Sequence, residues 1–517
     1  METQASVAKG ATSLYIANII ALLANTLYFL VLTNILRSTL GVGIVTSLNI
    51  MILLFVTISI LAQPVTLQSP VPAPLAVLKF IPELLAKNTR RGAVKVFYAS
   101  LSFTLILGVA IASILIAAPK LIIPFVGGQA VLPSYIQLAG VDVLAFSLLQ
   151  VCIGTLIALG DVKSATIYLI LWSIVRYTLA SLLLIPYAIT GVLLGWIVGD
   201  AAVLVAALFR STRDLRDGRG KKSSLSVTDV ARYSLYTLFS ALIGFAISQA
   251  DKIFMLTQQG LPELAIYNVA IVAASFAGFA PYALLTVLLP ALSALHARNR
   301  KGEMRRMIQM YTRYVSIIVL PIALGFASIT DVALRIFGPD YVIGFAPSVI
   351  VSVATGLTAI GVVYAAVLLA VGRLRWYTAA NVLGLGGLIL ISYLLTPLVG
   401  LSGPALGRAC LLALAAVVYA IATHRSGFFR LDWKAYLSAA GSSSIMGLIV
   451  YFALTFAHSF LAKLAMLPVA VVLGALIYLG SLRAMHLFTA RDLTFLRDIV
   501  PNRFHGLLEI VARLAGI

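Results

Sequence analysis

The sequence predicts an all-α polytopic membrane protein with about fourteen transmembrane helices. Two similar lobes of six helices each are expected, followed by two appended helices. Three observations predict this architecture. Apolar segments of membrane-spanning length recur along the chain, positive charge is concentrated in alternate connections, and the second half repeats the plan of the first.

The composition excludes a soluble globular protein. Of the 517 residues only 10% are charged, whereas soluble proteins carry about 25% charged residues, and the mean hydropathy is +1.06. The first apolar segment is too long for a cleaved signal peptide and has no basic region before it, so we expect it to be retained. The fourteen segments lie at 11–36, 43–62, 96–118, 134–159, 165–187, 190–209, 232–257, 263–289, 312–330, 346–371, 376–396, 403–423, 435–457 and 463–482.

The distribution of positive charge supports this assignment. If the N-terminus is cytoplasmic, 30 of the 37 Lys and Arg residues fall in cytoplasmic segments and five in external ones. Cytoplasmic loops of membrane proteins carry such an excess. We therefore expect a multi-pass protein of the cytoplasmic membrane with both termini inside. The net charge of +20 then reflects topology and anionic lipid, not nucleic acid.

An internal repeat relates the two halves. A shift of 212 positions aligns GDVKSATIYLILW from Gly160 with GRLRWYTAANVLG from Gly372, and Gly195 with Gly407. Each repeat holds six spans, so the lobes are predicted to share one orientation, with any substrate path at their interface.

Polar and proline-rich stretches set the predicted domain limits. The basic stretch from Arg210 contains Gly and Ser and is expected to be a flexible linker. The four prolines between 64 and 74, followed by APLAVLKFIPELLAKN, indicate either a broken helix beside a cavity or a cytoplasmic exit with an interfacial helix. The predicted domains are the first lobe at 1–209, the cytoplasmic linker at 210–231, the second lobe at 232–426, the appended helices at 427–486, and an amphipathic cytoplasmic tail at 487–517.

Three stretches resemble a known family. They are PLAVLKFIPELLAKNTRRGAVKVFYASL from Pro74, QADKIFMLTQQGLPELAIYNVA from Gln249, and IFGPDYVIGFAPSVIV from Ile336 with the segments that follow it. In order and spacing they are similar to the polysaccharide-transporter branch of the multidrug/oligosaccharidyl-lipid/polysaccharide (MOP) exporter superfamily, which includes the O-antigen-type flippases. The resemblance implies a MATE/MOP-like fold whose two lobes open alternately. It also implies a central cleft lined by the first, second, seventh and eighth spans.

Charged residues inside the spans are candidates for function because a charge in mid-membrane is costly. Arg176 and Asp200 lie equally far from residue 188, the centre of a predicted helical hairpin, and so at one depth. They form either an ion pair that fixes the hairpin or a phosphate contact with Asp200 as its modulator. Asp142 is a candidate protonatable coupling site or a structural partner of Arg176.

The pair Asp251 and Lys252 lies late in the seventh span. It forms a local pair at the outer rim, or it contacts the substrate or gates the lobes. Arg408 lies close enough to the outer face to extend to the surface.

Polar side chains recur every seven residues on two spans that border the implied cleft. Such stripes either join helices or line water-filled paths, and we favour lining. The stripes are formed by Asn18 and Asn25 on the first span and by Asn268, Ser275 and Tyr282 on the eighth.

We therefore predict a flippase that moves a polyprenyl-(pyro)phosphate-linked oligosaccharide by alternating access. A cation-coupled multidrug exporter of the same superfamily is the alternative, and an integral-membrane glycosyltransferase or polymerase is less favoured because every external loop is short. The sequence has no P-loop, no HExxH motif and no cluster of His and Cys, so we expect no enzyme activity, cofactor or metal. The expected partners are the lipid-linked oligosaccharide, membrane lipids and glycan-assembly enzymes, but no nucleic acid.

Overall fold

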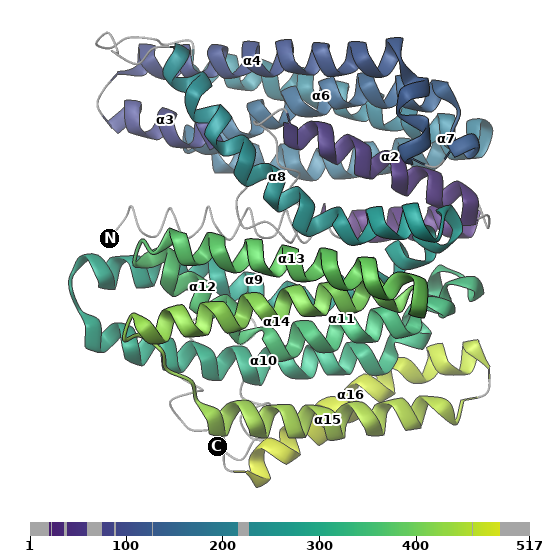
Figure 1. Ribbon diagram of the computed structural model, residues 1–517, viewed down its shortest axis with the longest axis vertical. Helices are drawn as coiled ribbons and strands as arrows, with labels where there is room; N and C mark the ends of the chain where they lie inside the picture. The colour runs from purple at the N-terminus through teal and green to yellow at the C-terminus, as the bar shows by residue number, and fades with distance from the viewer. Residues whose placement is uncertain are drawn as a thin grey trace. The chain divides into compact units, whose positions relative to one another are not determined.

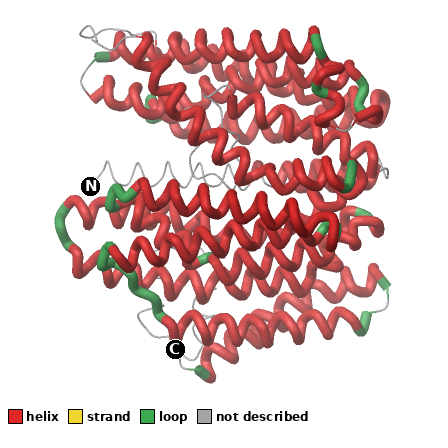
Figure 2. Tube along the Cα trace, viewed as in Figure 1, coloured by secondary structure: helices red, strands yellow, loops and turns green. Residues whose placement is uncertain are grey.

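The described part of the chain is entirely helical. The computed structural model describes residues 20–21, 23–35, 39–58, 75–86, 89–126, 128–215, 227–457 and 459–485. Across these ranges the backbone forms α-helices, turns and short 3-10 helices, with no strand (Figure 1; Figure 2). Ten helical segments in them are long and apolar enough to cross a membrane. The predicted all-α polytopic membrane fold is confirmed.

The chain divides into two compact units, which we describe separately. Unit 1 comprises Met1–Asn268 and unit 2 comprises Val269–Ile517. The division falls inside α9. The helices of unit 1 are an apolar helix at Leu23–Ile35, α2 (Thr39–Ile58), α3 (Leu75–Ala86), α4 (Arg90–Ala117), the short α5 (Ile123–Val126), α6 (Pro133–Ala158), α7 (Val162–Leu215) and α8 (Val227–Gln258).

Unit 2 is built in the same way from long apolar helices. Its helices are α9 (Leu261–Ala297), which begins in unit 1, α10 (Lys301–Phe337), α11 (Phe345–Thr358), α12 (Ile360–Ala370), α13 (Leu374–Val399), α14 (Ser402–Arg425), α15 (Trp433–Thr455) and α16 (Phe460–Ala484). Each of the fourteen predicted spans overlaps one of these helices. The span predicted at 346–371 is divided into α11 and α12 at Ala359, where the backbone stays helical with φ −55° and ψ −32°.

The helix α7 is a hairpin. Its 54 residues reverse direction at Ala188, where φ is 49° and ψ is −134°, as expected from the turn predicted at residue 188. We refer to residues 162–187 as its first arm and to residues 189–215 as its second arm. A Cβ on Gly195 would lie 2.4 Å from the backbone nitrogen of Ala180 on the opposite arm, so the glycine allows the two arms to touch.

The predicted repeat is visible in the helix bounds. The bounds of α6 and of the first arm of α7, moved by 212 positions, coincide with the limits of α11–α12 and of α13. The turn repeats as well, because Gly400 has φ 57° and ψ −128°, close to the values at Ala188. The duplication therefore extends to the backbone conformation of single residues.

The amphipathic segment after the prolines forms α3, which packs against α4 and α6. Val77 and Ile81 are fully buried on its apolar side. The four prolines themselves lie outside the described residues, as do residues 216–226 of the basic linker and the predicted amphipathic tail. The rest of the predicted linker is not flexible chain, because residues 210–215 end α7 and residues 227–231 begin α8.

The two appended helices are held to unit 2 by a small apolar core and by polar contacts. Val332, Met446 and Leu482 belong to this core. The hydroxyl of Tyr478 on α16 donates to the carbonyl of Ile317 on α10 at 2.7 Å. Both α15 and α16 thus pack on α10.

The compact units do not follow the domain limits expected from the repeat. The helix α8 opens the second repeat in the sequence, yet it packs against α2, α3 and α4 in unit 1. Compactness and duplication are different criteria, so the domain limits at 209, 231, 426 and 486 stay a prediction.

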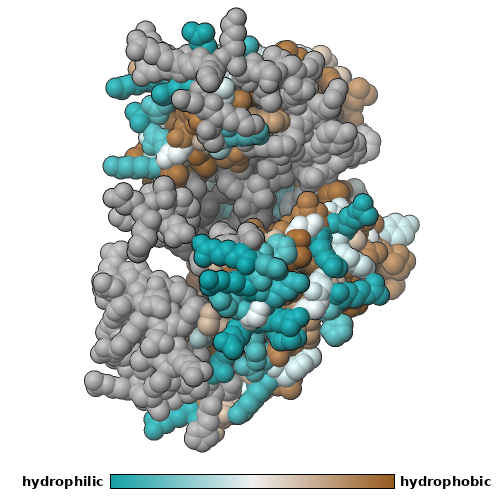
Figure 3. Space-filling view, turned by 90° about the vertical axis from the view of Figure 1, so that its left-hand side faces the viewer, coloured by the Kyte–Doolittle hydropathy of each residue, from teal (hydrophilic) through white to brown (hydrophobic). Residues whose placement is uncertain are grey.

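On the face seen in Figure 3, hydrophilic side chains of unit 2 gather beside hydrophobic ones. The exposed basic residues of unit 2 include Arg300 in the turn before α10, Arg373 in the turn before α13 and Arg425 at the end of α14. These turns belong to segments predicted to be cytoplasmic.

Candidate functional site

One buried arginine joins three helical segments of unit 1. Arg176 lies on the first arm of α7, and its Nη2 donates to Oδ2 of Asp142 on α6 at 3.1 Å. Its Nη1 donates to Oδ2 of Asp200 on the second arm. Both carboxylate side chains are fully buried, and the arginine side chain is 6% exposed. The predicted contact of Arg176 with Asp200 is present, and Asp142 joins it. We name these three residues the charge triad.

The hairpin positions the triad through a close approach of its arms. A Cβ on Gly199 would lie 2.8 Å from the Cα of Arg176, a separation that real side chains do not adopt. The glycine therefore lets the second arm lie directly on the first. Because Asp200 follows Gly199, its carboxylate is brought beside the guanidinium group.

Aromatic rings enclose the guanidinium group. Its central carbon lies 4.6 Å from the ring centre of Trp196, 5.5 Å from that of Phe146 and 5.9 Å from that of Trp172. These distances are in the range of cation–π interactions. The indole of Trp172 also donates to Oδ1 of Asp200 at 3.0 Å. Both carboxylate oxygens of Asp200 thus accept a hydrogen bond.

The first described helix of the chain contacts this enclosure. Tyr28, on the helix Leu23–Ile35, stacks on Tyr177 with ring centres 4.8 Å apart. Its ring also lies 6.4 Å from that of Trp196. Tyr28 therefore joins this helix to the aromatic residues around the triad.

The charges of the triad do not cancel when both acids are ionised. One guanidinium and two carboxylates leave a net charge of −1 in a fully buried place, which is unfavourable unless one carboxyl binds a proton. Oδ1 of Asp142 is buried and has no hydrogen-bond partner among the described residues. Asp142 is therefore the better placed of the two carboxyls to bind that proton.

The second predicted pair is arranged differently. Asp251 on α8 is fully buried, and the hydroxyl of Tyr267 on α9 donates to its Oδ2 at 2.7 Å. Lys252 beside it is half-buried. Arg408 on α14 is 6% exposed, so it is buried instead of extending to the surface.

The structure describes three of the five residues in the predicted polar stripes. Asn25 is half-buried and Asn268 is buried. The hydroxyl of Ser275 donates to the carbonyl of Val272 in its own helix at 2.6 Å. Asn18 and the side chain of Tyr282 lie outside the described residues, so a lining role for the stripes stays a prediction.

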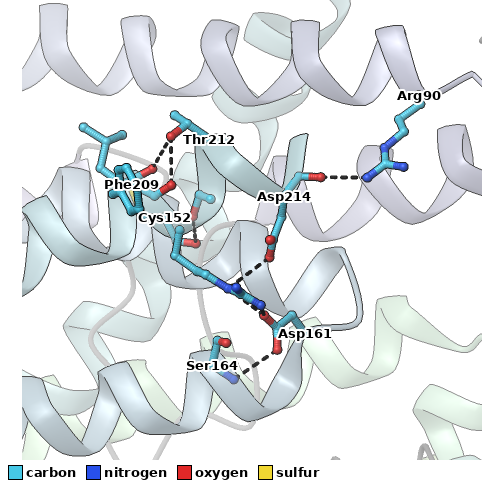
Figure 4. A network of polar contacts seen from close by, with 10 residues as sticks. Arg90, Cys152, Asp161, Ser164, Phe209, Thr212 and Asp214 are labelled. Atoms are coloured by element: carbon cyan, nitrogen blue, oxygen red, sulfur yellow. Dashed lines mark hydrogen bonds and ion pairs between the residues drawn. The ribbon is translucent and has the colours of Figure 1, made fainter. Parts of the chain in front are cut away.

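A second polar network closes one end of unit 1 (Figure 4). The guanidinium group of Arg210, late in the second arm of α7, donates to Oδ2 of Asp161 in the α6–α7 turn at 2.8 Å and pairs with Asp214 at 3.3 Å. Arg90, at the start of α4, donates to the backbone carbonyl of Asp214 at 2.7 Å. We name this set the turn network. It joins α4, the α6–α7 turn and the end of α7.

The turn network favours the ionised form of Asp161. Partial burial acts to raise the pKa of Asp161, but hydrogen bonds from Ser164 and Arg210 outweigh it and hold the pKa below its usual range. The carboxylate is therefore charged at neutral pH.

A profile match covers the middle of the chain. Residues 87–341, just under half of the 517 residues, match the profile of the polysaccharide biosynthesis protein family. The matched region contains the charge triad, the turn network and the pair Asp251–Tyr267. A sequence search of curated proteins finds no match.

Solved structures of similar fold cover most of this chain. A structure titled "Lipid II flippase MurJ, inward closed conformation" is similar with a TM-score of 0.70 and 12% identity, covering 94% of this chain and 99% of that one. An inward-facing multidrug resistance MATE family transporter of the MOP superfamily has a TM-score of 0.58 at 14% identity, over 81% and 93% of the two chains. A mutant of the Vibrio cholerae MATE transporter VcmN has a TM-score of 0.57 at 14% identity, over 82% and 99%.

Within this fold, sequence reasoning missed the residues that complete the sites. Trp172, Trp196 and Phe146 around Arg176 look like ordinary apolar residues of their spans. Tyr267 belongs to one of the family-like stretches, but its contact with Asp251 was not predicted. A usable signal existed for two of them. Trp172 and Trp196 each lie four residues from a triad residue, and such residues are neighbours on one helix face.

Proposed function

We propose that this protein is a flippase for polyprenyl-(pyro)phosphate-linked oligosaccharides. The observation that carries the proposal is the likeness to the lipid II flippase fold over 94% of this chain. The match to the polysaccharide biosynthesis family supports the same substrate class. A lipid-linked glycan needs a polar route for its head and contact with lipid for its tail, which a polytopic helical transporter can provide.

A cation-coupled multidrug exporter is the second candidate. It is supported by the likeness to MATE transporters, although that likeness covers 81% of the chain. Reconstitution separates the two functions. Purified protein in liposomes is given a fluorescent lipid-linked oligosaccharide on one leaflet and, in a parallel sample, a lipophilic dye cation.

We expect the oligosaccharide lipid to become accessible to a glycosidase on the opposite side, and no accumulation of the dye. Transport of the dye without movement of the glycolipid would replace the flippase by the exporter. Protein-free liposomes and liposomes with an unrelated membrane protein are the controls.

We also propose that the charge triad couples this movement to protons, with Asp142 as the protonatable group. The net charge of −1 and the unpartnered Oδ1 of Asp142 support this role. Arg176 then acts as a positioning residue, because both of its terminal nitrogens are bound by carboxylates. Tyr28 passes the change in charge to the first helix through its stack on Tyr177.

A further inference from the structure

The helix α6 carries buried polar side chains that the charge triad does not use. Gln150 is 1% exposed, and neither its Oε1 nor its Nε2 has a hydrogen-bond partner among the described residues. The hydroxyl oxygen of Ser147, one turn away, is buried and unpartnered in the same way. Buried amides without a partner are costly, and ordered water commonly satisfies such groups.

These side chains lead away from the triad along α6. At 1.5 Å per residue, Gln150 lies about 12 Å from Asp142 in the direction of the α6–α7 turn, with Ser147 between them. At about 100° per residue, Gln150 lies about 80° and Ser147 about 140° around the helix from Asp142, so the three side chains span less than half of its circumference. The turn network around Asp161 lies at the end of this direction.

The internal repeat shows that the fold does not need these polar groups. The helices α11 and α12 of unit 2 cover the same positions, moved by 212 residues. The residues that correspond to Asp142, Ser147 and Gln150 there are Ala354, Ala359 and Val362. Arg176 likewise corresponds to Leu388. The same backbone is thus built in unit 2 with apolar residues at these four positions, although α11 carries the buried Ser348 and Ser352 at other positions. The backbone plan therefore does not require the polar set of unit 1.

We propose that water molecules bound by Ser147 and Gln150 form a proton path inside unit 1, from the α6–α7 turn to Asp142. A proton enters from a hydronium ion beside Asp161 and passes from water to water. It forms an O–H bond at Oδ1 of Asp142, and the last donor returns to neutral water. The net charge of the triad changes from −1 to zero.

The ionisable groups facing Asp142 fit this role. Arg176 and Asp200 face it from α7, and Tyr28, stacked on Tyr177, lies against Trp196 beside the guanidinium group. The proposal rests on the proposed coupling role of Asp142. It does not depend on the identity of the transported lipid.

Infrared spectroscopy of the full-length protein in detergent tests the path without any transport. The carboxylic acid band of Asp142 is identified by its loss in Asp142→Asn, and its hydrogen–deuterium exchange is followed after dilution into D2O. Gln150→Met fills a similar volume but cannot hold a water chain, so we expect the band to keep its amplitude and to exchange at least about tenfold more slowly. Gln150→Asn keeps an amide and should exchange within about threefold of the wild type.

The matched control is Leu149→Met, which changes a fully buried neighbour on the same helix without removing a polar group. It should leave the exchange rate unchanged.

If Gln150→Met does not give a folded protein, Ser147→Ala takes its place, with slowing of about threefold expected. An exchange rate equal to the wild type in the variant used would overturn the path. Absence of any band assignable to Asp142 would also overturn it, because the path would have no acceptor. Neither result bears on whether the protein flips glycolipids.

Discussion

In the charge triad, two buried carboxylates share one arginine. A buried charge is tolerated only when its partners are in place, and the loss of one partner leaves the others uncompensated. Asp142, Arg176 and Asp200 come from α6 and from both arms of α7, so they hold together the helices that carry them. The aromatic rings of Trp172 and Trp196 lie against the guanidinium group of Arg176.

Arg176→Ala is expected to abolish glycan export and to lower the free energy of unfolding by about 3–5 kcal/mol, because it leaves two buried carboxylates unpaired. Thermal unfolding in detergent and a glycan export assay measure the two effects. The triple variant Arg176→Met, Asp142→Asn, Asp200→Asn removes all three charges and should regain most of the lost stability. Normal export by Arg176→Ala would reduce Arg176 to a residue without a role in transport.

At the scale of elements, the hairpins of the two units are built on one plan. The first hairpin turns at Ala188 and the second at Gly400, with nearly equal backbone angles. A positive φ is accessible to glycine at little cost but strains alanine. The first hairpin therefore carries strain that the second avoids.

Opposite effects are expected from exchanging these two residues. Ala188→Gly should raise the free energy of unfolding by up to about 1 kcal/mol, and Gly400→Ala should lower it by about 1 kcal/mol or more. No atom lies within 4 Å of a Cβ added at Gly400, so the loss of stability in Gly400→Ala comes from backbone strain alone. Melting temperatures of both variants check this, and a rise for Gly400→Ala would contradict the assigned turn.

The turn network gives the α6–α7 connection a pH dependence. The folded-state pKa of Asp161 is held below its usual range. The ionised carboxylate therefore adds fully to the free energy of unfolding above about pH 4, and this stabilisation is lost as the pH falls through the lower, folded-state pKa. Asp161→Asn should lower the melting temperature by a few degrees at pH 7, since partly exposed ion pairs are weak. Near pH 3 the difference from the wild type should shrink, and a constant difference would exclude the ionised form as its source.

At the scale of the whole molecule, duplication and divergence explain what the sequence could predict. The spans were predictable because a bilayer demands about twenty apolar residues for each crossing, and the repeat was visible in pairs such as Gly160 and Gly372. The contact of Arg176 with Asp200 followed from hairpin geometry. The partners Trp172, Trp196 and Tyr267 were not predictable by the same rules, since an aromatic residue in a span has the same hydropathy whether it faces lipid or a buried charge. The packing of α8 in unit 1 depends on side-chain fit, which periodicity does not encode.

The two units share a backbone plan and differ in their interiors. Unit 1 carries charge where unit 2 has Ala354 and Leu388. We therefore expect proton coupling at the charge triad of unit 1. The equivalent positions of unit 2 are uncharged, although its α14 holds the buried Arg408.

The most direct test of the account is glycolipid flipping in liposomes with a clamped proton gradient, for the wild type and for Asp142→Asn. Asparagine keeps the size of the side chain but cannot change charge. We expect the wild-type rate to follow the imposed gradient and the Asp142→Asn rate to be independent of it. A variant that responds to the gradient as the wild type does would remove Asp142 from the mechanism and contradict the account.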